Sequence, residues 1–390
     1  MLKQKLISFE MGNPGSEGSV ELNKLLRRHK AGGAVTAKEW LSAGLPVSGR
    51  LLEKIIAEGA FYDALKFVTK NIDRTNNGHL DGINSLSWHG SNTLISASND
   101  KTVKIIDVNR GEVVFTLGLN NGGHASEVIG TSVSADGRLL ASTGYDKLII
   151  ITDLETREVK AVIDNGDLAS QMTWSPKGNK LAVTNWMDDA TPETVKIYRW
   201  ENEALVPDRK INMAGNFAWH PNGQLMAFSS RGSIRLIDLR VANSRPVDFG
   251  DWKYGLIKEM CWSPNGEKLA MADRSGHVMI DPASKNWRQL LDGRRRDSSI
   301  YITSLEWSVD SKTIYVGDNC GEIRHYNAEN WELLFSLNKK NGGYQGHGIG
   351  RLSPDGQLLA TSGIVTIRGV KGDDVAVRVF PVQDLVKADE

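Results

Sequence analysis

Trp262-Ser263-Pro264-Asn265-Gly266 is the stretch that decides the fold, because close relatives of it recur along the chain at a nearly constant distance. We call the first residue of each copy its anchor. The anchors are, in chain order, Trp88, Val133, Trp174, Trp219, Trp262, Trp307 and Leu352. Successive anchors lie 41 to 45 residues apart. A period of about 40 to 45 residues is typical of four-stranded propeller blades, whereas helical arrays repeat near 34 residues.

The repeated stretch has the composition of a hairpin turn. Proline favours the second position of a tight turn, asparagine or aspartate tolerates the third, and glycine follows where a positive φ is needed. A short apolar segment precedes the turn at residues 255–262, and another follows it at residues 268–272. Short apolar segments bounded by turn signals predict two antiparallel strands joined by this turn.

Two more strands are predicted in each period. The third ends at pairs such as Ile106-Asp107 and Thr152-Asp153, and the fourth precedes the next anchor, as at residues 113–117, 159–163 and 333–337. Four strands in each of seven periods predict an all-β fold, a seven-bladed β-propeller. Closing the blades into a ring leaves only short, protected strand edges.

From about residue 60 to 382 the chain resembles the WD40-repeat family, most clearly in its first two blades. Gly-His pairs, strand serines and turn aspartates stand where that family places them. These residues are His79, Ser96 and Asp100 in the first blade and His124, Ser142 and Asp146 in the second. The resemblance implies that each set forms a structural hydrogen-bond network. No blade has tryptophan at the Trp-Asp position of the family, so the network is expected to be partial.

Composition excludes several classes of protein. Of the 390 residues, 40% are hydrophobic, which is enough to bury a large core. Lysine plus arginine and aspartate plus glutamate number 47 each, so the chain lacks the positive charge of a general nucleic-acid coat. Two cysteines cannot build a disulfide framework and favour a reducing compartment. We expect a protein without membrane segments in the cytoplasm, with the nucleus as the alternative.

The N-terminal part reads differently from the repeats. Residues 11–18 are rich in helix breakers, and a flexible N-terminus is predicted over residues 1–18. Residues 19–59 predict a helical extension, in which Thr36 and Glu39 have capping-box spacing. The propeller is expected over 60–382, with the closing strand of the last blade within 60–72, at Ala64–Lys70. Residues 383–390 are expected to be a C-terminal tail.

The N-terminal helices leave an alternative function open. Two helices joined by a short glycine-containing turn also resemble a helix-turn-helix DNA reader. Arg50 and Lys54 on the second helix could meet phosphates, but Glu53 and Glu58 would repel them. A nucleic-acid-associated regulator is therefore the alternative to a protein-binding role, and nucleic acid is not the partner we expect.

The search for catalytic and metal-binding motifs predicts none of either kind. No G-x-S-x-G elbow, P-loop, dinucleotide fingerprint or H-E-x-x-H occurs. Asp188, Asp189 and Glu193 could hold a hard cation, but they lack the spacing of a calcium loop. We expect no catalytic residue, no cofactor and no metal, and a hydrolase or lactonase-type propeller is the least favoured reading.

Rigid scaffolds that carry variable loops usually bind partners. In WD40-like discs the loops that enter each first strand share one face with the turns between the second and third strands. Aromatic and arginine residues, which are enriched at binding hot spots, gather there. The predicted partner-binding residues are Trp252, Tyr254, Arg294, Arg295, Arg296 and Tyr301. They predict a non-enzymatic interaction scaffold for a protein or a peptide with an apolar anchor beside acidic or phosphorylated residues.

Overall fold

A computed structural model gives the fold of the repeats. It describes residues 78–185, 194–212, 215–230, 232–252, 256–273, 276–280, 286–289, 301–319, 322–337, 349–362 and 377–382. The predicted flexible N-terminus, helical extension and closing strand, as well as the C-terminal tail 383–390, lie outside these residues. No helix in the described part is long and apolar enough to cross a membrane.

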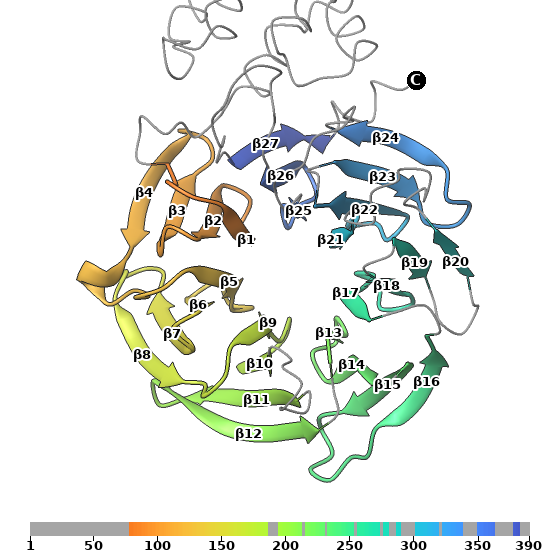
Figure 1. The fold of residues 1–390 in the computed structure, drawn as a ribbon, viewed down its shortest axis with the longest axis horizontal. Helices are drawn as coiled ribbons and strands as arrows, with labels where there is room; N and C mark the ends of the chain where they lie inside the picture. The colour runs from red at the N-terminus through yellow and green to blue at the C-terminus, as the bar shows by residue number, and fades with distance from the viewer. Residues whose placement is uncertain are drawn as a thin grey trace, which may run out of the picture.

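The described strands form sheets arranged as blades around a central axis (Figure 1). Blade 1 contains β1 (Ile83–His89), β2 (Thr93–Ser98), β3 (Val103–Asp107) and β4 (Glu112–Leu117), and a short 3-10 helix, η2 (Leu119–Asn121), follows it. Blade 2 contains β5 (Val128–Val133), β6 (Leu139–Gly144), β7 (Leu148–Asp153) and β8 (Val159–Asp164). Blade 3 contains β9 (Ala169–Trp174), β10 (Lys180–Asn185), β11 (Thr194–Glu201) and β12 (Ala204–Asn212).

The second half of the ring repeats this order. Blade 4 contains β13 (Phe217–Trp219), β14 (Leu225–Ser230), β15 (Ser233–Asp238) and β16 (Val247–Asp251). Blade 5 contains β17 (Ile257–Trp262), β18 (Leu269–Asp273), β19 (His277–Ile280) and β20 (Asn286–Gln289). Blade 6 contains β21 (Ile302–Trp307), β22 (Thr313–Asp318), β23 (Ile323–Asn327) and β24 (Leu333–Leu337). The last sheet contains β25 (Ile349–Leu352), β26 (Leu358–Ser362) and β27 (Val377–Pro381).

The all-β propeller prediction is confirmed, but the count of strands needs a correction. Six sheets are complete four-stranded blades, and the seventh, which we call blade 7, has three strands among the described residues. The prediction of seven four-stranded blades therefore holds for six of them. The fourth strand of blade 7 was predicted from residues 64–70, which lie outside the described part of the chain.

The repeated turn has the geometry that its sequence predicts. In blade 5 the Ser263 hydroxyl donates to Asn265 Oδ1 at 2.7 Å and accepts from the Lys268 N–H at 2.9 Å. Gly266 has a φ of 76°, in the left-handed region that glycine adopts at least cost. The turn is thus closed by its own side chain, and Ser263 is fully buried.

Apolar faces of neighbouring blades pack against each other to form the core. Between blades 5 and 6, for example, Ala272 and Ile280 meet Leu305, Trp307 and Val316 in one buried cluster. The second strand of each blade is covered on both faces by neighbouring blades. Its sequence is therefore a short run of apolar residues. The ring is therefore held by inter-blade packing.

Three anchor tryptophans add a hydrogen bond to this packing. Each donates its indole N–H to a main-chain carbonyl of the preceding blade: Trp88 to Arg351 at 3.0 Å, Trp219 to Thr173 at 3.2 Å and Trp307 to Cys261 at 3.1 Å. The bond from Trp88 joins blade 1 to blade 7. It therefore ties the two ends of the described propeller together.

We expect Trp88→Phe to lower the free energy of unfolding by about 1 kcal/mol more than Trp262→Phe. Both changes keep an aromatic ring, but only the first removes a hydrogen bond, because the buried Trp262 indole N–H has no partner among the described residues. Urea unfolding followed by fluorescence measures both. Equal losses would mean that the indole bond at the ring closure contributes nothing measurable.

Candidate functional site

A hydrogen-bond network fastens the loop that enters blade 1. His79 Nε2 lies 2.8 Å from Ser96 Oγ, and His79 Nδ1 lies 2.8 Å from Asp100 Oδ2. Asp100 also accepts hydrogen bonds from the main-chain N–H groups of Leu80 and Thr102 and from the Thr102 hydroxyl. The histidine before the first strand is thereby fixed to the second strand and to the turn that follows it.

This network favours an ionised Asp100. Burial opposes ionisation, but hydrogen bonds from His79, Thr102 and Leu80 and the nearby charge of His79 outweigh it. Together they hold the pKa of the Asp100 carboxyl well below its usual value. The carboxylate is therefore a strong acceptor at the centre of the loop, and losing it would leave several buried donors unpaired.

Blade 2 repeats the same arrangement. His124 Nε2 lies 3.0 Å from Ser142 Oγ, and His124 Nδ1 lies 2.9 Å from Asp146 Oδ1. All six residues predicted for the structural network thus make the expected contacts. Thr152 stands where the WD40 pattern has tryptophan, and its buried hydroxyl has no hydrogen-bond partner among the described residues. The network is partial, as the missing tryptophan predicts.

The order of contacts in both blades matches that of a hydrolytic Ser-His-Asp triad. A nucleophile must reach its substrate, however, and Ser96 on β2 and Ser142 on β6 are fully buried. The same arrangement also occurs twice at equivalent positions, as a structural element does. We therefore assign these residues to loop anchoring.

Blades 5 and 6 hold the turn after their second strand with other side chains. In blade 5 the His277 ring Nδ1 lies 2.9 Å from Asp273 Oδ2, within the turn between β18 and β19. In blade 6 the Arg324 guanidinium bonds Asp318 Oδ2 at 3.1 Å and Glu322 Oε2 at 2.6 Å. Sequence reasoning missed these contacts because it searched for Gly-His pairs. The available signal was the aspartate that ends β18 and β22, Asp273 and Asp318.

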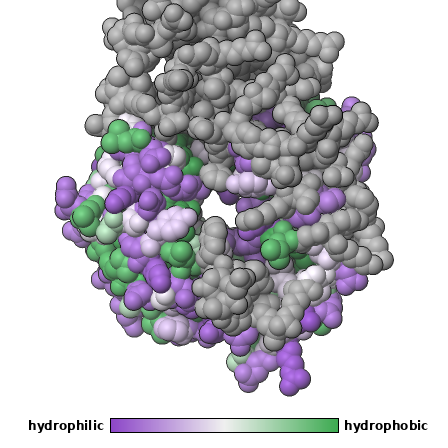
Figure 2. Space-filling model, viewed as in Figure 1, coloured by the Kyte–Doolittle hydropathy of each residue, from purple (hydrophilic) through white to green (hydrophobic). Residues whose placement is uncertain are grey.

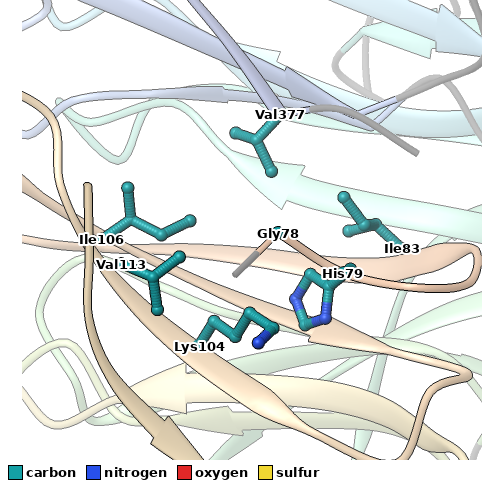
Figure 3. Close-up of a pocket in the computed structure, with 7 residues that line it drawn as sticks. All are labelled: Gly78, His79, Ile83, Lys104, Ile106, Val113 and Val377. Atoms are coloured by element: carbon teal, nitrogen blue, oxygen red, sulfur yellow. The ribbon is translucent and has the colours of Figure 1, made fainter. Parts of the chain in front are cut away.

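A small cavity lies beside Ile106, at the position where the WD40 pattern has tryptophan (Figure 3). Its lining residues are Gly78, His79, Ile83, Lys104, Ile106, Val113 and, from blade 7, Val377. The centre of a water molecule can occupy about 10 Å³ of this cavity, so the cavity has room for about one water. Burial lowers the pKa of Lys104 here, against the opposing effect of Asp100. The cavity is too small for a metabolite.

The prediction that Trp252 contacts a partner is wrong. β16 runs to Asp251, so Gly250 and Asp251 belong to the outer strand of blade 4 and not to a loop. The Trp252 N–H donates to the Gly232 carbonyl at 2.8 Å and continues the hairpin. Its side chain is 3% exposed and packs in the core cluster between blades 4 and 5, beside Ile257. Trp252 is therefore a folding residue.

The other predicted contact residues have a mixed outcome. Tyr301 is partly buried, and its main-chain N–H donates to Asn319 Oδ1 at 2.8 Å just before β21. Tyr254 and the three arginines 294–296 lie outside the described residues, so their role stays a prediction. The possible cation ligands at 188, 189 and 193 lie outside them as well. Within the described residues, no group of three or more histidine, cysteine, aspartate or glutamate side chains could hold a metal ion.

Leu80 and Tyr145 are among the exposed apolar side chains on the loop face at blades 1 and 2. Leu80, in the loop before β1, is 78% exposed, and Tyr145, in the turn between β6 and β7, is 47% exposed. The start of each first strand pairs with the end of the second strand, as Val128 does with Gly144, so loop and turn lie at the same end of a blade. We call Leu80 and Tyr145 the blade 1–2 patch.

The blade 1–2 patch rests on a fixed framework. The Leu80 N–H is held by Asp100, and the Tyr145 N–H donates to the Glu127 carbonyl at 2.9 Å. Asn84 Nδ2 donates to the Val128 carbonyl at 2.9 Å and links the two blades at this face. Sequence reasoning missed the patch because each of its residues is a single apolar residue in a polar loop.

Two family models match the chain. The model described as WD domain, G-beta repeat, matches residues 71–107 and 111–153. The model of the anaphase-promoting complex subunit 4 WD40 domain matches residues 260–349.

Similar proteins carry the same repeats. Cross-pathway control WD-repeat protein 2 of Flammulina velutipes is 30% identical over 30% of this chain and 34% of its own length. The small ribosomal subunit protein RACK1 of Caenorhabditis elegans is 26% identical over 43% of this chain and 54% of its own length. The chain thus spans about a third to a half of the relatives it matches. The structure of U3-55K superimposes with a TM-score of 0.63 over 78% of this chain and 97% of that one, at 17% identity.

Proposed function

Because the chain belongs to the WD40-repeat β-propeller family, we propose that it is a non-enzymatic scaffold whose loop face captures a protein partner. A closed ring of inter-packed blades gives a rigid support, and its loops are free to contact other molecules. The relative named as a small ribosomal subunit protein is a component of a larger assembly, which supports this reading.

The exposure of Leu80 and Tyr145 on an ordered framework is the observation that carries the proposal. Large apolar side chains with anchored main chains lose little conformational entropy on binding, and tyrosine is enriched at hot spots. Lys101 and Lys147 are exposed in the two turns of the same face. The patch therefore suits a protein segment with an apolar anchor and nearby acidic or phosphorylated groups.

We propose the cytoplasm as the location of the protein.

We expect the double variant Leu80→Ala, Tyr145→Ala to weaken capture of the partner by about 2 kcal/mol, close to thirtyfold. Both side chains point to solvent, so folding should be unchanged. The measurement is quantitative comparison of proteins recovered from native lysate with wild type and variant as baits, after equal melting temperatures have been verified.

A matched control removes the same kind of surface from the rim. Val162 on β8 and Val247 on β16 are 53% and 65% exposed and lie on outer strands, away from the loop face. Val162→Ala with Val247→Ala should retain every captured protein. If the rim variant loses partners and the face variant does not, the loop face at blades 1 and 2 is not the binding surface.

A further inference from the structure

One titratable side chain stands at a position that every other blade fills with an aliphatic residue. Strand pairing defines this position on the third strand: in blade 1, Ser87 before the anchor pairs with Ile95, and Ile95 pairs with Ile105. In order of blades the equivalent residues are Ile105, Ile151, Ile197, Leu236, Ile280, His325 and Val379. Each of the six aliphatic side chains packs in an apolar cluster shared with the next blade. His325 on β23 therefore faces blade 7.

The packing of a neighbour of His325 supports this orientation. Ile323 lies two residues before His325, on the same face of β23. A Cβ added to Gly350 on β25 would lie 3.1 Å from Ile323 Cδ1 and 3.7 Å from Leu359 Cδ1, so this face of blade 6 touches blade 7. The space-filling view shows an opening at the centre of the ring (Figure 2), so blade 6 is held by its two neighbours (Figure 1). The surroundings of His325 belong to one of these two contacts.

The His325 ring lies between two aromatic rings of its own sheet. Strand pairing places Tyr315 on β22 and Phe335 on β24 directly beside it. The Tyr315 ring is stacked on the imidazole, with centroids 4.0 Å apart and planes inclined by 14°, and the Phe335 centroid lies at 4.8 Å. The His325 residue is 3% exposed, and both aromatic residues are buried as well. The imidazole is thus packed as an apolar side chain would be.

The two ring nitrogens differ in their partners. Nε2 lies 2.6 Å from Thr313 Oγ1, whereas Nδ1 has no hydrogen-bond partner among the described residues. A neutral imidazole satisfies this arrangement with its proton on Nε2, because Nδ1 is then only an unused acceptor. A protonated ring would add a buried N–H donor at Nδ1 without an acceptor, which is costly.

The charges around the ring compensate little for such a proton. Burial lowers the pKa of His325 to about 4, although the charge of Asp310, in the turn between β21 and β22, acts in the opposite direction. Tyr315 stays neutral because burial raises its pKa. Glu306 follows Tyr315 in the same cross-strand row, but its carboxylate pairs with Arg351 of β25 at 3.7 Å. A tyrosine face attracts a cation, yet a buried charge without a counter-charge costs more.

We propose that His325 makes the contact between blades 6 and 7 sensitive to acid. The neutral ring fills the position of an aliphatic side chain. A proton taken up from solvent at Nδ1 converts the ring to an imidazolium and loosens the aromatic stack that faces blade 7. This conformational device does not depend on the proposed binding function.

The direction of the effect follows from proton linkage. A histidine whose folded pKa lies below its ordinary value of 6.5 takes up a proton when the chain unfolds at intermediate pH. Its stabilising contribution is therefore complete above pH 6.5 and is lost as pH falls from about 6.5 through about 4.

The test compares melting temperatures of the full chain at pH 7.5 and 5.0. The decrease in wild type should exceed that in His325→Gln by about 3 °C. Glutamine keeps a polar side chain near Thr313 but cannot titrate, and comparing each protein with itself cancels any difference in overall stability. His325→Ile, which introduces the residue of blades 1 to 3, should match His325→Gln. The control His89→Gln, at a half-buried histidine on β1, should keep the wild-type decrease.

Hydrogen exchange at pH 5.0 locates the effect. Peptides covering β22 to β25 should exchange faster in wild type than in His325→Gln, whereas peptides of blades 1 to 3 should exchange equally in the two proteins. Two outcomes would overturn the proposal: equal decreases in melting temperature for wild type and both His325 variants, or faster exchange that is spread evenly over all blades.

Discussion

Asp100→Ala is expected to lower the free energy of unfolding by about 3 kcal/mol at pH 7. The carboxylate is only 7% exposed and is the shared acceptor for His79, Thr102 and the Leu80 N–H. Removing the carboxylate leaves several donors without an acceptor. An unpaired buried donor costs more free energy than the loss of a hydrogen bond that water can replace. Urea unfolding of wild type and variant measures the loss.

The effect should depend on pH in a defined direction. Because the folded pKa of Asp100 is depressed, its stabilising contribution is complete above the ordinary value of 3.8 and disappears as pH falls through the folded value. Asp248→Ala is the control, since that side chain is 76% exposed and, among the described residues, pairs with Arg235 alone at the surface. A loss at Asp100 no larger than at Asp248 would mean that the loop anchor carries no stability.

Deleting residues 1–72 is expected to lower the melting temperature by about 5 °C or more and to promote association, whereas deleting residues 1–59 changes neither. β27 pairs with β26 along one edge, and its other edge has no strand partner among the described residues. The alternating segment 64–70 is the predicted partner for that edge. Without it, an open strand edge becomes a template for other chains.

Melting curves and light scattering of both truncations measure this effect. Val68→Pro in the full chain is a second test, because proline cannot donate a strand hydrogen bond at the middle of the segment. Equal melting temperatures and equal monodispersity for the two truncations would contradict the idea that residues 60–72 close the ring.

The fold could be predicted because its signals are local and repeated. The turn around Gly266 requires a positive φ, and the same requirement returns at Gly178, Gly223 and Gly356. The loop anchors at His79 and His124 could be located because their serine and aspartate partners stand at regular spacings. Local geometry and a constant period together determine the number and order of the blades.

The partner-binding residues were predicted less accurately than the fold. Whether a residue near a strand end is exposed or buried depends on where the strand ends, which the sequence does not fix. Gly250 suggested a loop before Trp252, but the β15–β16 hairpin extends past it and buries the indole. The ion pair between Glu306 and Arg351 depends on two strands more than 40 residues apart meeting at the axis. Their composition alone gives no sign of this proximity.

The most direct test of the binding proposal is site-specific photo-crosslinking. A photoreactive amino acid is placed at Tyr145 on the loop face and, in a separate protein, at Val162 on the rim, two positions of similar exposure. After irradiation in native lysate, the account predicts discrete crosslinked species from position 145 and none of them from position 162. Crosslinks to the same species from position 162, with none from position 145, would contradict it.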